Sequence, residues 1–434
     1  MVLTIIIASI IFLLIAISAF LFPTLKIKRI RFDTYWVIAL IGAIILLISN
    51  LSPIDKVIDS LFSNSEVNPI KILILFFSMT IMSIYLDELG FFKYLATKAA
   101  KISKSSQYGL FLIVYGLTAI LTIFTSNDIV ILTLTPFIIF FCKNSDIDPL
   151  PYLMGEFAAA NTWSMMLMIG NPTNIYLATS NSITFLDYFK IMSVPTIISG
   201  AIQLLIIFTI FHKKLAKKIN KVQLEETKLN NKLDVIIGLV HLSICLIFLV
   251  ISSYIHIEMY LISLIAMISL IVSSLIIRII TKSHFEYITH SFKRLPYALI
   301  PFFLSMFVIV VSFITQGVST HFSSFLNLMN PIYSYGISSF LMSNVMNNIP
   351  MSIFYSSLTS SLEGLNQTKA IYASIIGSNI GALFTPLGAL AGLMFSSLVR
   401  KKGVRFSFLD FFKYGVLISI PTLFVSLITL SLTL

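Results

Sequence analysis

Two polar clusters interrupt long apolar stretches of the sequence, and their side chains are of the types that bind ions and small solutes. They consist of Ser126, Asn127 and Asp128 within 109–142, and of Ser343, Asn344, Asn347 and Asn348 within 332–360. Ser, Asn and Asp cap helix N-termini, where free N–H groups carry a partial positive charge. A carboxylate at membrane depth is costly, so Asp128 favours ion or proton handling. Capping alone is the other interpretation of both clusters.

Two further apolar regions are interrupted by Gly, Pro, Asn and Thr at corresponding places in the chain. Their polar residues are Asn171, Thr173 and Asn174 within 151–180, and Ser378, Asn379 and Thr385 within 369–399. Gly and Pro open the helical hydrogen-bond ladder, and Asn or Thr side chains can then satisfy the freed backbone or hold a ligand. Paired breaks of this kind predict a transport site near the membrane midplane. Two structural kinks are the alternative.

Other ionisable or metal-binding side chains within the apolar regions are few. Glu156 suits a proton relay or, alternatively, an acid at the interfacial start of a helix. His241 and Cys245 lie one helical turn apart, but two ligands do not make a metal site, so packing is the better interpretation. The sequence contains no nucleotide motif and no catalytic triad. It therefore predicts neither an enzyme nor a resident cofactor.

The composition excludes a soluble protein. Of 434 residues, 57% are apolar and 11% are charged, whereas a soluble domain carries about 25% charged residues. The net charge of +11 comes from short basic clusters between apolar runs, which is typical of a membrane protein and not of a nucleic-acid binder. Runs long enough to span the hydrocarbon lie near 2–22, 35–51, 69–86, 192–211, 233–253, 258–280, 296–315 and 414–433.

The basic clusters predict the orientation of these runs. They occupy 26–31, 93–104, 213–221, 282–294 and 400–405. The positive-inside rule then places the clusters in the cytoplasm and both termini outside. Polar tips are poorly placed in lipid, so 109–142 and 332–360 are interpreted as re-entrant hairpins rather than pairs of full spans. The predicted fold is an all-α polytopic membrane protein with about 11 transmembrane helices plus the two hairpins. Segments 91–104 and 317–330 are expected to lie along the membrane interfaces.

The chain contains an internal repeat. Ser126-Asn127 recurs as Ser343-Asn344, 217 positions later, which is half the length of the chain. Residues 186–190 (LDYFK) recur as 409–413 (LDFFK), and each copy is followed by Ser-x-Pro-Thr. In the predicted topology the copies enter the membrane from opposite sides, as in the inverted repeats of many secondary transporters. The predicted units are a first repeat (1–211, with the cytoplasmic-side hairpin), a basic cytoplasmic linker (212–232) and a second repeat (233–434, with the extracellular-side hairpin).

These motifs resemble the ion-transporter superfamily that includes the arsenite permease ArsB, the NhaD-type sodium/proton antiporters and the divalent-anion/sodium symporters. The resemblance covers nearly the whole chain. The second half is most similar to ArsB, through Val-Met-Asn-Asn-x-Pro at 345–350 and Thr-Pro-x-Gly-x-Leu-Ala at 385–391. Dicarboxylate symporters carry Ser-Asn-Thr at both hairpin tips, whereas the third residue here is Asp128 or Val345. The most specific segments are 125–136 (TSNDIVILTLTP), 169–178 (IGNPTNIYLA), 343–350 (SNVMNNIP) and 377–395 (GSNIGALFTPLGALAGLMF).

The resemblance implies an alternating-access carrier of the plasma membrane. Because Asp128 would repel a carboxylate, the first interpretation is proton-coupled efflux of arsenite or antimonite, with Asp128 and Glu156 as coupling groups. One alternative is Na⁺-coupled transport of a small organic or inorganic anion such as citrate or a dicarboxylate, with Na⁺ near Asn127, Asp128 and Asn171. The other is Na⁺/H⁺ antiport. The expected partners are the lipid bilayer and a small solute, and the resemblance adds a second copy of the chain and a separate arsenite ATPase subunit as candidates.

Overall fold

The computed structural model describes residues 1–22, 24–27, 30–62, 68–102, 106–219, 229, 231–281 and 286–434. Parts of the basic clusters and of the predicted linker 212–232, including 220–228 and 230, lie outside these described residues. The first half consists of α1 (Val2–Leu21), β1 (Thr24–Ile27), β2 (Ile30–Asp33), α2 (Thr34–Ile48), α3 (Ile54–Phe62), α4 (Pro69–Glu88), α5 (Phe91–Ile102), α6 (Gln107–Phe124), α7 (Asn127–Asn144), α8 (Leu150–Trp163), η1 (Met168–Gly170), α9 (Pro172–Thr179) and α10 (Phe185–Leu215).

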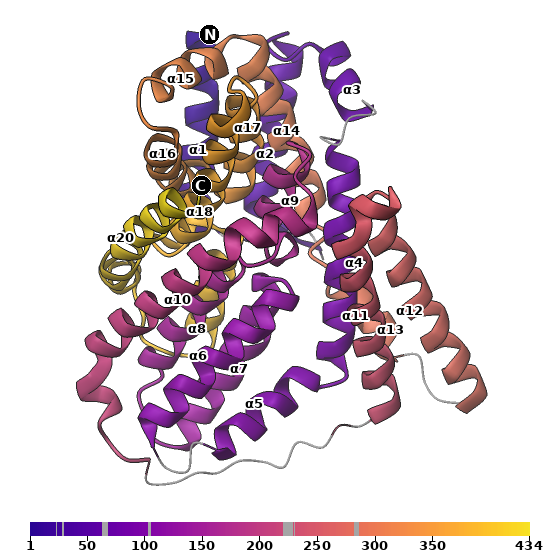
Figure 1. Cartoon of the computed structure of the whole chain (residues 1–434), viewed down its shortest axis with the longest axis vertical. Coiled ribbons are helices and arrows are strands. Elements are labelled where there is room, and N and C mark those ends of the chain that lie inside the picture. The colour runs from indigo at the N-terminus through magenta and orange to yellow at the C-terminus, as the bar shows by residue number, and fades with distance from the viewer. Residues whose placement is uncertain are drawn as a thin grey trace.

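The second half presents the same order of helices as the first (Figure 1). In both halves a long helix, a hairpin of two helices and a helix broken by a short 3₁₀ turn follow one another, and a long final helix closes the series. The exact boundaries of two inverted repeats and of a linker stay a prediction. The elements are α11 (Lys232–Ile255), α12 (Met259–Thr281), α13 (Glu286–Lys293), α14 (Leu299–Thr315), α15 (Val318–Leu326), α16 (Pro331–Met346), α17 (Asn348–Thr359), α18 (Gly364–Gly381), η2 (Pro386–Gly388), α19 (Leu390–Lys401) and α20 (Phe408–Thr433).

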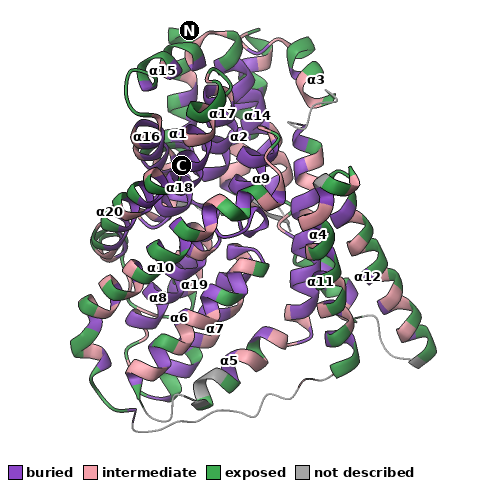
Figure 2. Cartoon of the chain, in the orientation of Figure 1, coloured by how far each residue is buried: buried purple, intermediate pink, exposed green. Residues whose placement is uncertain are grey.

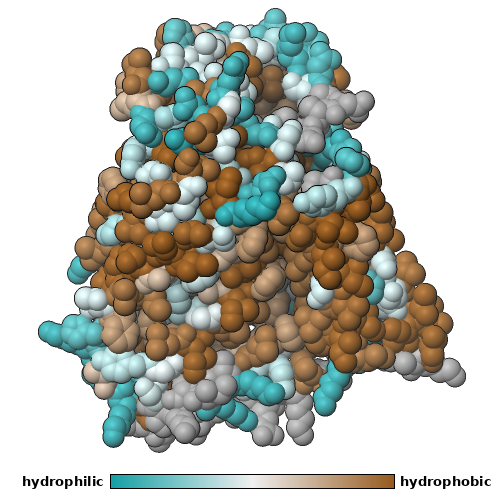
Figure 3. Space-filling view, in the orientation of Figure 1, coloured by the Kyte–Doolittle hydropathy of each residue, from teal (hydrophilic) through white to brown (hydrophobic). Residues whose placement is uncertain are grey.

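The surface of the molecule is that of a protein that spans a bilayer. Figure 3 shows a broad hydrophobic band around the middle and hydrophilic side chains at the upper and lower ends. Among the described residues, seven helices are long and apolar enough to cross a membrane, or up to eight if α14 and α15, which are bent by 77°, count as one span. The polytopic all-helical fold is thereby confirmed. The count of about 11 crossings, which includes the broken helices, stays a prediction.

The two hairpins lie toward opposite ends of the molecule. Figure 1 shows α6 and α7 in the lower half and α16 and α17 in the upper half. A short helix precedes each hairpin, α5 below and α15 above, where the sequence predicts interfacial segments. Gly90 and Gly317 stand immediately before these helices, both with positive φ (75° and 73°). Glycine adopts this backbone without a Cβ clash, so the chain turns sharply from a spanning helix into a lateral one.

The helices form two frame-like groups around a central body. α4 packs against α11, α12 and α13, whereas α14 packs against α1 and α2. The remaining long elements, α6 to α10 and α16 to α20, pack mainly against one another. Figure 2 shows buried residues concentrated in this body and exposed residues along α12 and α20 at the flanks. The buried helices contain many polar side chains, which are the candidates for function.

The bases of the two lateral helices are anchored differently. Before α5, the Arg294 guanidinium contacts the Glu88 carboxylate at 2.6 Å and the Asp87 carboxylate at 2.7 Å. Before α15, Thr315 and Gln316 donate neutral hydrogen bonds of 3.2 Å to the Leu51 carbonyl. The base of α5 is therefore held by ion pairs and the base of α15 by neutral groups.

Four short elements were not predicted from the sequence. The strands Thr24–Ile27 and Ile30–Asp33 pair in antiparallel register, with Leu25 opposite Phe32, and α3 and α13 are brief helices in charged loops. Each element is too short to show a hydrophobic period of its own, and each is stabilised by packing against longer helices. The small sheet does not change the helical class of the fold.

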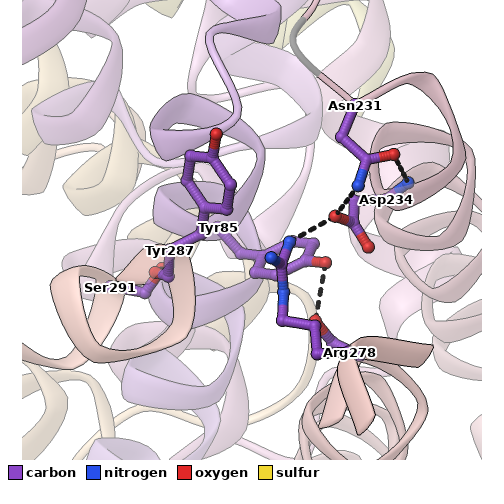
Figure 4. A network of polar contacts seen from close by, with 7 residues as sticks. Tyr85, Asn231, Asp234, Arg278, Tyr287 and Ser291 are labelled. Carbon is purple, nitrogen blue, oxygen red and sulfur yellow. Dashed lines mark hydrogen bonds and ion pairs between the residues drawn. The ribbon is translucent and has the colours of Figure 1, made fainter. Parts of the chain in front are cut away.

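A buried ion pair joins α11 to α12 and faces α4 (Figure 4). The Arg278 guanidinium donates to the Asp234 carboxylate, and both side chains are almost fully buried. Asn231 caps α11 and donates to the same carboxylate at 2.5 Å. The Tyr287 ring lies 5.0 Å from the Arg278 guanidinium carbon, and the Tyr85 hydroxyl lies 3.0 Å from that of Ser274. Three helices are thus tied together by groups that must stay paired.

Replacing Arg278 by Met is expected to lower the free energy of unfolding by roughly 3–5 kcal/mol, because it leaves the Asp234 carboxylate buried without a cation. The double variant Asp234→Leu/Arg278→Met should recover most of that loss, since it removes both charges. Thermal unfolding of the purified protein in detergent measures both effects. Lys190→Met, at the exposed Lys190–Asp187 pair, is the control and should change stability by about 0.5 kcal/mol or less. Equal losses in the single and double variants would contradict this account.

Candidate transport site

The first broken helix opens because its sequence forces the backbone out of the helical region. α8 ends at Trp163, and α9 begins with Pro172. Asn171 adopts an extended conformation (φ −151°, ψ 139°), and its side-chain oxygen accepts the Thr173 N–H at 3.2 Å. A Cβ on Gly170 would overlap the Ser164 carbonyl oxygen, so the close approach of the backbone at position 170 to Ser164 requires glycine.

The second broken helix repeats this construction. α18 ends at Gly381, and the chain resumes as a helix at Leu390 after η2. The Thr385 hydroxyl accepts the Leu387 N–H at 3.2 Å, which caps η2 at its Pro386 start. Predicted breaks and observed breaks coincide in both halves. At each break an Asn or Thr caps the element that follows.

Asn379 connects the two broken helices. Its side-chain oxygen accepts hydrogen bonds from Ser164 at 3.1 Å and from Asn171 at 2.9 Å. Its side-chain nitrogen donates to the Asn174 oxygen at 2.6 Å and to the Ile375 carbonyl at 2.8 Å. All of these side-chain groups are buried. Asn174 in turn donates to the Ser164 carbonyl at 2.9 Å, which a continuous helix would have paired.

The tip of the first hairpin meets the first broken helix. Asn127 donates to the Asn161 side-chain oxygen at 3.2 Å, and its own oxygen accepts the Asp128 N–H at 2.9 Å. Ser126 occupies the N-cap position of α7 but makes no capping bond, and its hydroxyl is buried without a partner among the described residues. Capping alone therefore does not account for Ser126. The Asp128 carboxylate makes no hydrogen bond or ion pair with any described residue.

The tip of the second hairpin meets the second broken helix. Asn344 accepts the Thr385 hydroxyl at 2.7 Å and donates to the Gly381 carbonyl at 2.9 Å. Asn347 has positive φ (73°), caps α17 and donates to the Leu387 carbonyl at 3.1 Å. The Asn348 side-chain oxygen is buried and has no partner among the described residues. The hairpin thus pairs the open backbone at the second break.

The same hairpin packs closely against α18 through glycine. A Cβ on Gly377 would overlap the Ser339 hydroxyl and the Gly336 carbonyl, and one on Gly381 would overlap the Ser343 hydroxyl. Small residues allow two helices in a membrane to approach until their backbones touch. The Ser378 hydroxyl, on the neighbouring position, is buried without a partner among the described residues.

The site combines amides, hydroxyls and helix N-termini. Ser126, Asn348 and Ser378 each present a buried oxygen without a protein partner in the described part of the chain. α7 packs against α19, and α9 packs against α17, so four helices that begin at the breaks and tips are paired across the halves. Their free N–H groups carry partial positive charge. Groups of these types hydrogen-bond to hydroxylated or anionic solutes.

Glu156 lies apart from the hairpin tips. It is fully buried on α8, and the Thr135 hydroxyl lies 2.9 and 3.0 Å from its two carboxylate oxygens. Its burial within α8 excludes the alternative interpretation of Glu156 as a solvated acid at the interfacial start of a helix. Its role in proton coupling stays a prediction.

The remaining candidate ligands are packed as the sequence suggests. The His241 ring lies 2.8 Å from the Ile237 carbonyl and 3.1 Å from the Ser269 hydroxyl, and the Cys245 thiol lies 3.8 Å from the Met79 sulfur. No group of three His, Cys, Asp or Glu side chains among the described residues could hold a metal ion. The Asn171 side-chain nitrogen donates to Asn379 at 2.9 Å, and a sodium ion near Asn127, Asp128 and Asn171 stays a prediction.

Several polar residues of this region were not anticipated. Ser164 belongs to the same hydrogen-bonded group as Asn379, although the sequence analysis does not place it in the site. Its signal is its position, since it directly follows the last turn of α8. Asp234 and Arg278 were missed because they stand in terminal turns, where charged residues are ordinarily solvated.

The chain is similar to known membrane transporters over most of its length. A sequence model of the citrate transporter family (CitMHS) matches residues 1–363. An arsenical pump membrane protein of Yersinia enterocolitica is 25% identical over 376 residues, which cover 83% of this chain and 85% of that protein. One from Escherichia coli K12 is 26% identical over 378 residues, with the same coverage.

A solved structure has the same fold. The crystal structure of the YdaH transporter of Alcanivorax borkumensis, described as having an unusual topology, aligns with a TM-score of 0.54 at 13% sequence identity. The alignment covers 99% of this chain and 97% of that one. The apolar helices and the similar transporters together identify a multi-pass protein of the plasma membrane.

Gly377→Ala is expected to destabilise the protein by roughly 1–3 kcal/mol, because α16 and α18 must separate to admit the Cβ. Gly116 in α6 is the matched control, since it is also helical and has no other atom within 4 Å of an added Cβ. Gly116→Ala should be neutral or stabilising by up to about 1 kcal/mol. The melting temperatures of the two variants in detergent, each compared with the wild type, measure these changes in stability. Similar values for both would show that the close approach is unimportant.

Asn379→Ala should lower the melting temperature markedly, because it leaves Asn171 and Asn174 buried without their partner at a cost of about 1–3 kcal/mol for each group. Asn330→Ala, which removes only the exposed cap of α16, should cost about 1 kcal/mol. Thermal unfolding of both variants provides the comparison. A smaller loss for Asn379→Ala than for Asn330→Ala would contradict the connecting role of Asn379.

Proposed function

The chain belongs to the citrate transporter family of membrane transporters, and from that premise we propose that it exports arsenite or antimonite in exchange for protons by alternating access. The observation that carries the proposal is the Asp128 carboxylate at the first hairpin tip, which has no cation or hydrogen-bond partner among the described residues. Relatives that share most of the chain are named arsenical pump membrane proteins. The arsenical cargo in the names of those relatives is consistent with the amide and hydroxyl groups of this site.

The side chains at the tips and breaks favour a neutral, hydroxylated cargo. Segments 122–130, 161–174, 343–350 and 377–390 contain no Lys or Arg. An organic anion would therefore meet Asp128 without a basic side chain to offset the repulsion. Arsenious and antimonous acids carry hydroxyl groups and no charge near neutral pH. The amides of Asn127 and Asn348 and the hydroxyls of Ser126 and Ser378 can bond to such groups. Neither cysteine lies in these segments, which favours hydrogen bonding over capture by sulfur.

Asp128 provides a means of coupling in this proposal. A charged carboxylate is costly to carry through the hydrocarbon unless it is protonated or hydrogen-bonded. The carrier therefore crosses with Asp128 bonded to the hydroxyls of the cargo, or empty with Asp128 protonated. Movement of the empty, charged form is suppressed. Exchange of one cargo molecule for one proton follows from this restriction, and Glu156 is a second group that could relay the proton.

The arrangement of the helices suits alternating access. The central body of α6 to α10 and α16 to α20 carries all four tips and breaks, and it connects to the frame through the lateral helices α5 and α15. Glycines with positive φ precede both lateral helices. We propose that the body moves relative to the frame with these glycines as pivots, which would expose the site to one side at a time.

Sodium-coupled transport of an anion such as citrate is the second candidate. It is favoured by the description of the family as citrate transporters and by the helix N-termini near the site, which suit negative charge. In this case Na⁺ bound at Asp128 would remove the repulsion. Such a carrier would need Na⁺ for every anion that it moves.

The test is solute accumulation by everted membrane vesicles with an imposed pH gradient, acid inside. The wild-type protein should accumulate arsenite without Na⁺. Asp128→Asn should lower this accumulation at least tenfold while its melting temperature stays near that of the wild type, because Asn cannot exchange a proton. Asp55→Asn, on the exposed face of α3, is the control and should transport normally.

The outcomes separate the candidates. Full accumulation by Asp128→Asn would refute the proposed coupling group. Accumulation of citrate that requires Na⁺, with no arsenite transport, would establish the second candidate instead. A Na⁺ flux that needs no other solute would identify Na⁺/H⁺ antiport.

A further inference from the structure

A cavity whose lining contains none of the site amides lies at the turn between α19 and α20. Its volume is about 330 Å³. It extends from η2, at the second broken helix, to the basic end of α19. The helix α19 has 12 residues and is therefore about 18 Å long. No role in the proposed transport cycle requires it. It is lined by Pro386, Ser396, Arg400, Phe406, Ser407 and Phe408.

The mouth of the cavity is strongly basic. Arg400, Lys401, Lys402 and Arg405 stand within six positions and are exposed. Neither the Arg400 nor the Arg405 side chain has a hydrogen bond or ion pair with a described residue. The nearest acid in the turn, Asp410, is occupied by the cap of α20, where it accepts the Ser407 hydroxyl at 2.7 Å and the Ser407 N–H at 2.9 Å. Arg400 therefore lines the cavity without a counter-anion among the described residues.

The wall of the cavity is aromatic. Phe406 packs edge-on against Phe395 and tilted against Phe411, with ring centroids 6.2 and 6.0 Å apart. Phe408 stacks on Phe412 at 6.4 Å and is 41% exposed. α20 forms an outer flank of the molecule (Figure 1). An apolar wall at this position is suited to contact with acyl chains.

We propose that this cavity binds an anionic phospholipid, with its phosphate on Arg400 and an acyl chain along Phe406 and Phe408 toward Pro386. Arginine recognises phosphate through paired donors, and basic clusters at the cytoplasmic end of a spanning helix attract anionic lipids. A soluble phosphate would share the contact with Arg400 but would leave the aromatic wall in water. Because the cavity reaches η2, the bound lipid stabilises the segment that closes the second break. This inference does not depend on which solute is transported.

The experiment is thermal unfolding of the purified full-length protein in detergent, titrated with phosphatidylglycerol, phosphatidylcholine or glycerol phosphate. Phosphatidylglycerol alone should raise the melting temperature. Arg400→Gln should weaken its apparent affinity by about fivefold, the effect of one basic residue at a lipid surface. Arg405→Gln removes the same charge from the same turn but does not line the cavity, so its affinity should stay near that of the wild type. Ser396→Phe fills the cavity, keeps the charge and should also reduce the effect.

Three results would overturn the proposal. Equal weakening by Arg400→Gln and Arg405→Gln would show general attraction to a basic surface. Stabilisation by glycerol phosphate equal to that by phosphatidylglycerol would show a site for a soluble phosphate. An undiminished response in Ser396→Phe would place the lipid elsewhere.

Discussion

Every backbone group that a helix leaves unpaired inside the hydrocarbon must find another partner in the protein, and this requirement organises the centre of the molecule. Two helices are broken there, and the freed carbonyls of Ser164, Gly381 and Leu387 are paired by Asn174, Asn344 and Asn347. The residues that stabilise the breaks are therefore those that form the candidate site. Stability and function depend on one set of hydrogen bonds, and few of these side chains can change independently.

The frame around this centre follows a different rule. Its ionic contacts, which include Asp234 with Arg278, Arg294 with Asp87 and Glu88, and Lys71 with Glu258, are in the terminal turns of spanning helices or in their loops. At these depths charged groups can be partly desolvated and still be paired. The base of α15 is held by neutral contacts to Leu51. The central body, which carries the site amides and the Asp128 carboxylate, is thus connected to the frame through two differently anchored lateral helices.

Sequence reasoning predicted most of the elements, because a spanning helix must be long and apolar and a break must contain Gly, Pro or Asn. The hairpins at 109–142 and 332–360 and the breaks in 151–180 and 369–399 lie where the pattern indicates them. The β1–β2 hairpin and the helices α3 and α13 were not predicted, since each is short and takes its stability from neighbours. Arg278 was overlooked for a related reason: a basic residue in the last turn of a helix is normally solvated, and only packing against α4 buries it.

The sequence by itself determined the class of the protein, the positions of its polar interruptions and the chemistry available there, because hydropathy and helix-breaking residues act locally. The tertiary structure decided which of these residues meet. Asn379 and Asn171 are 208 positions apart and share a hydrogen bond, whereas the Asp128 carboxylate has no hydrogen bond or ion pair with a described residue. The pairing of Asn379 with Asn171 depends on how helices from the two halves pack, and packing is set by shape complementarity across the whole molecule rather than by any one segment.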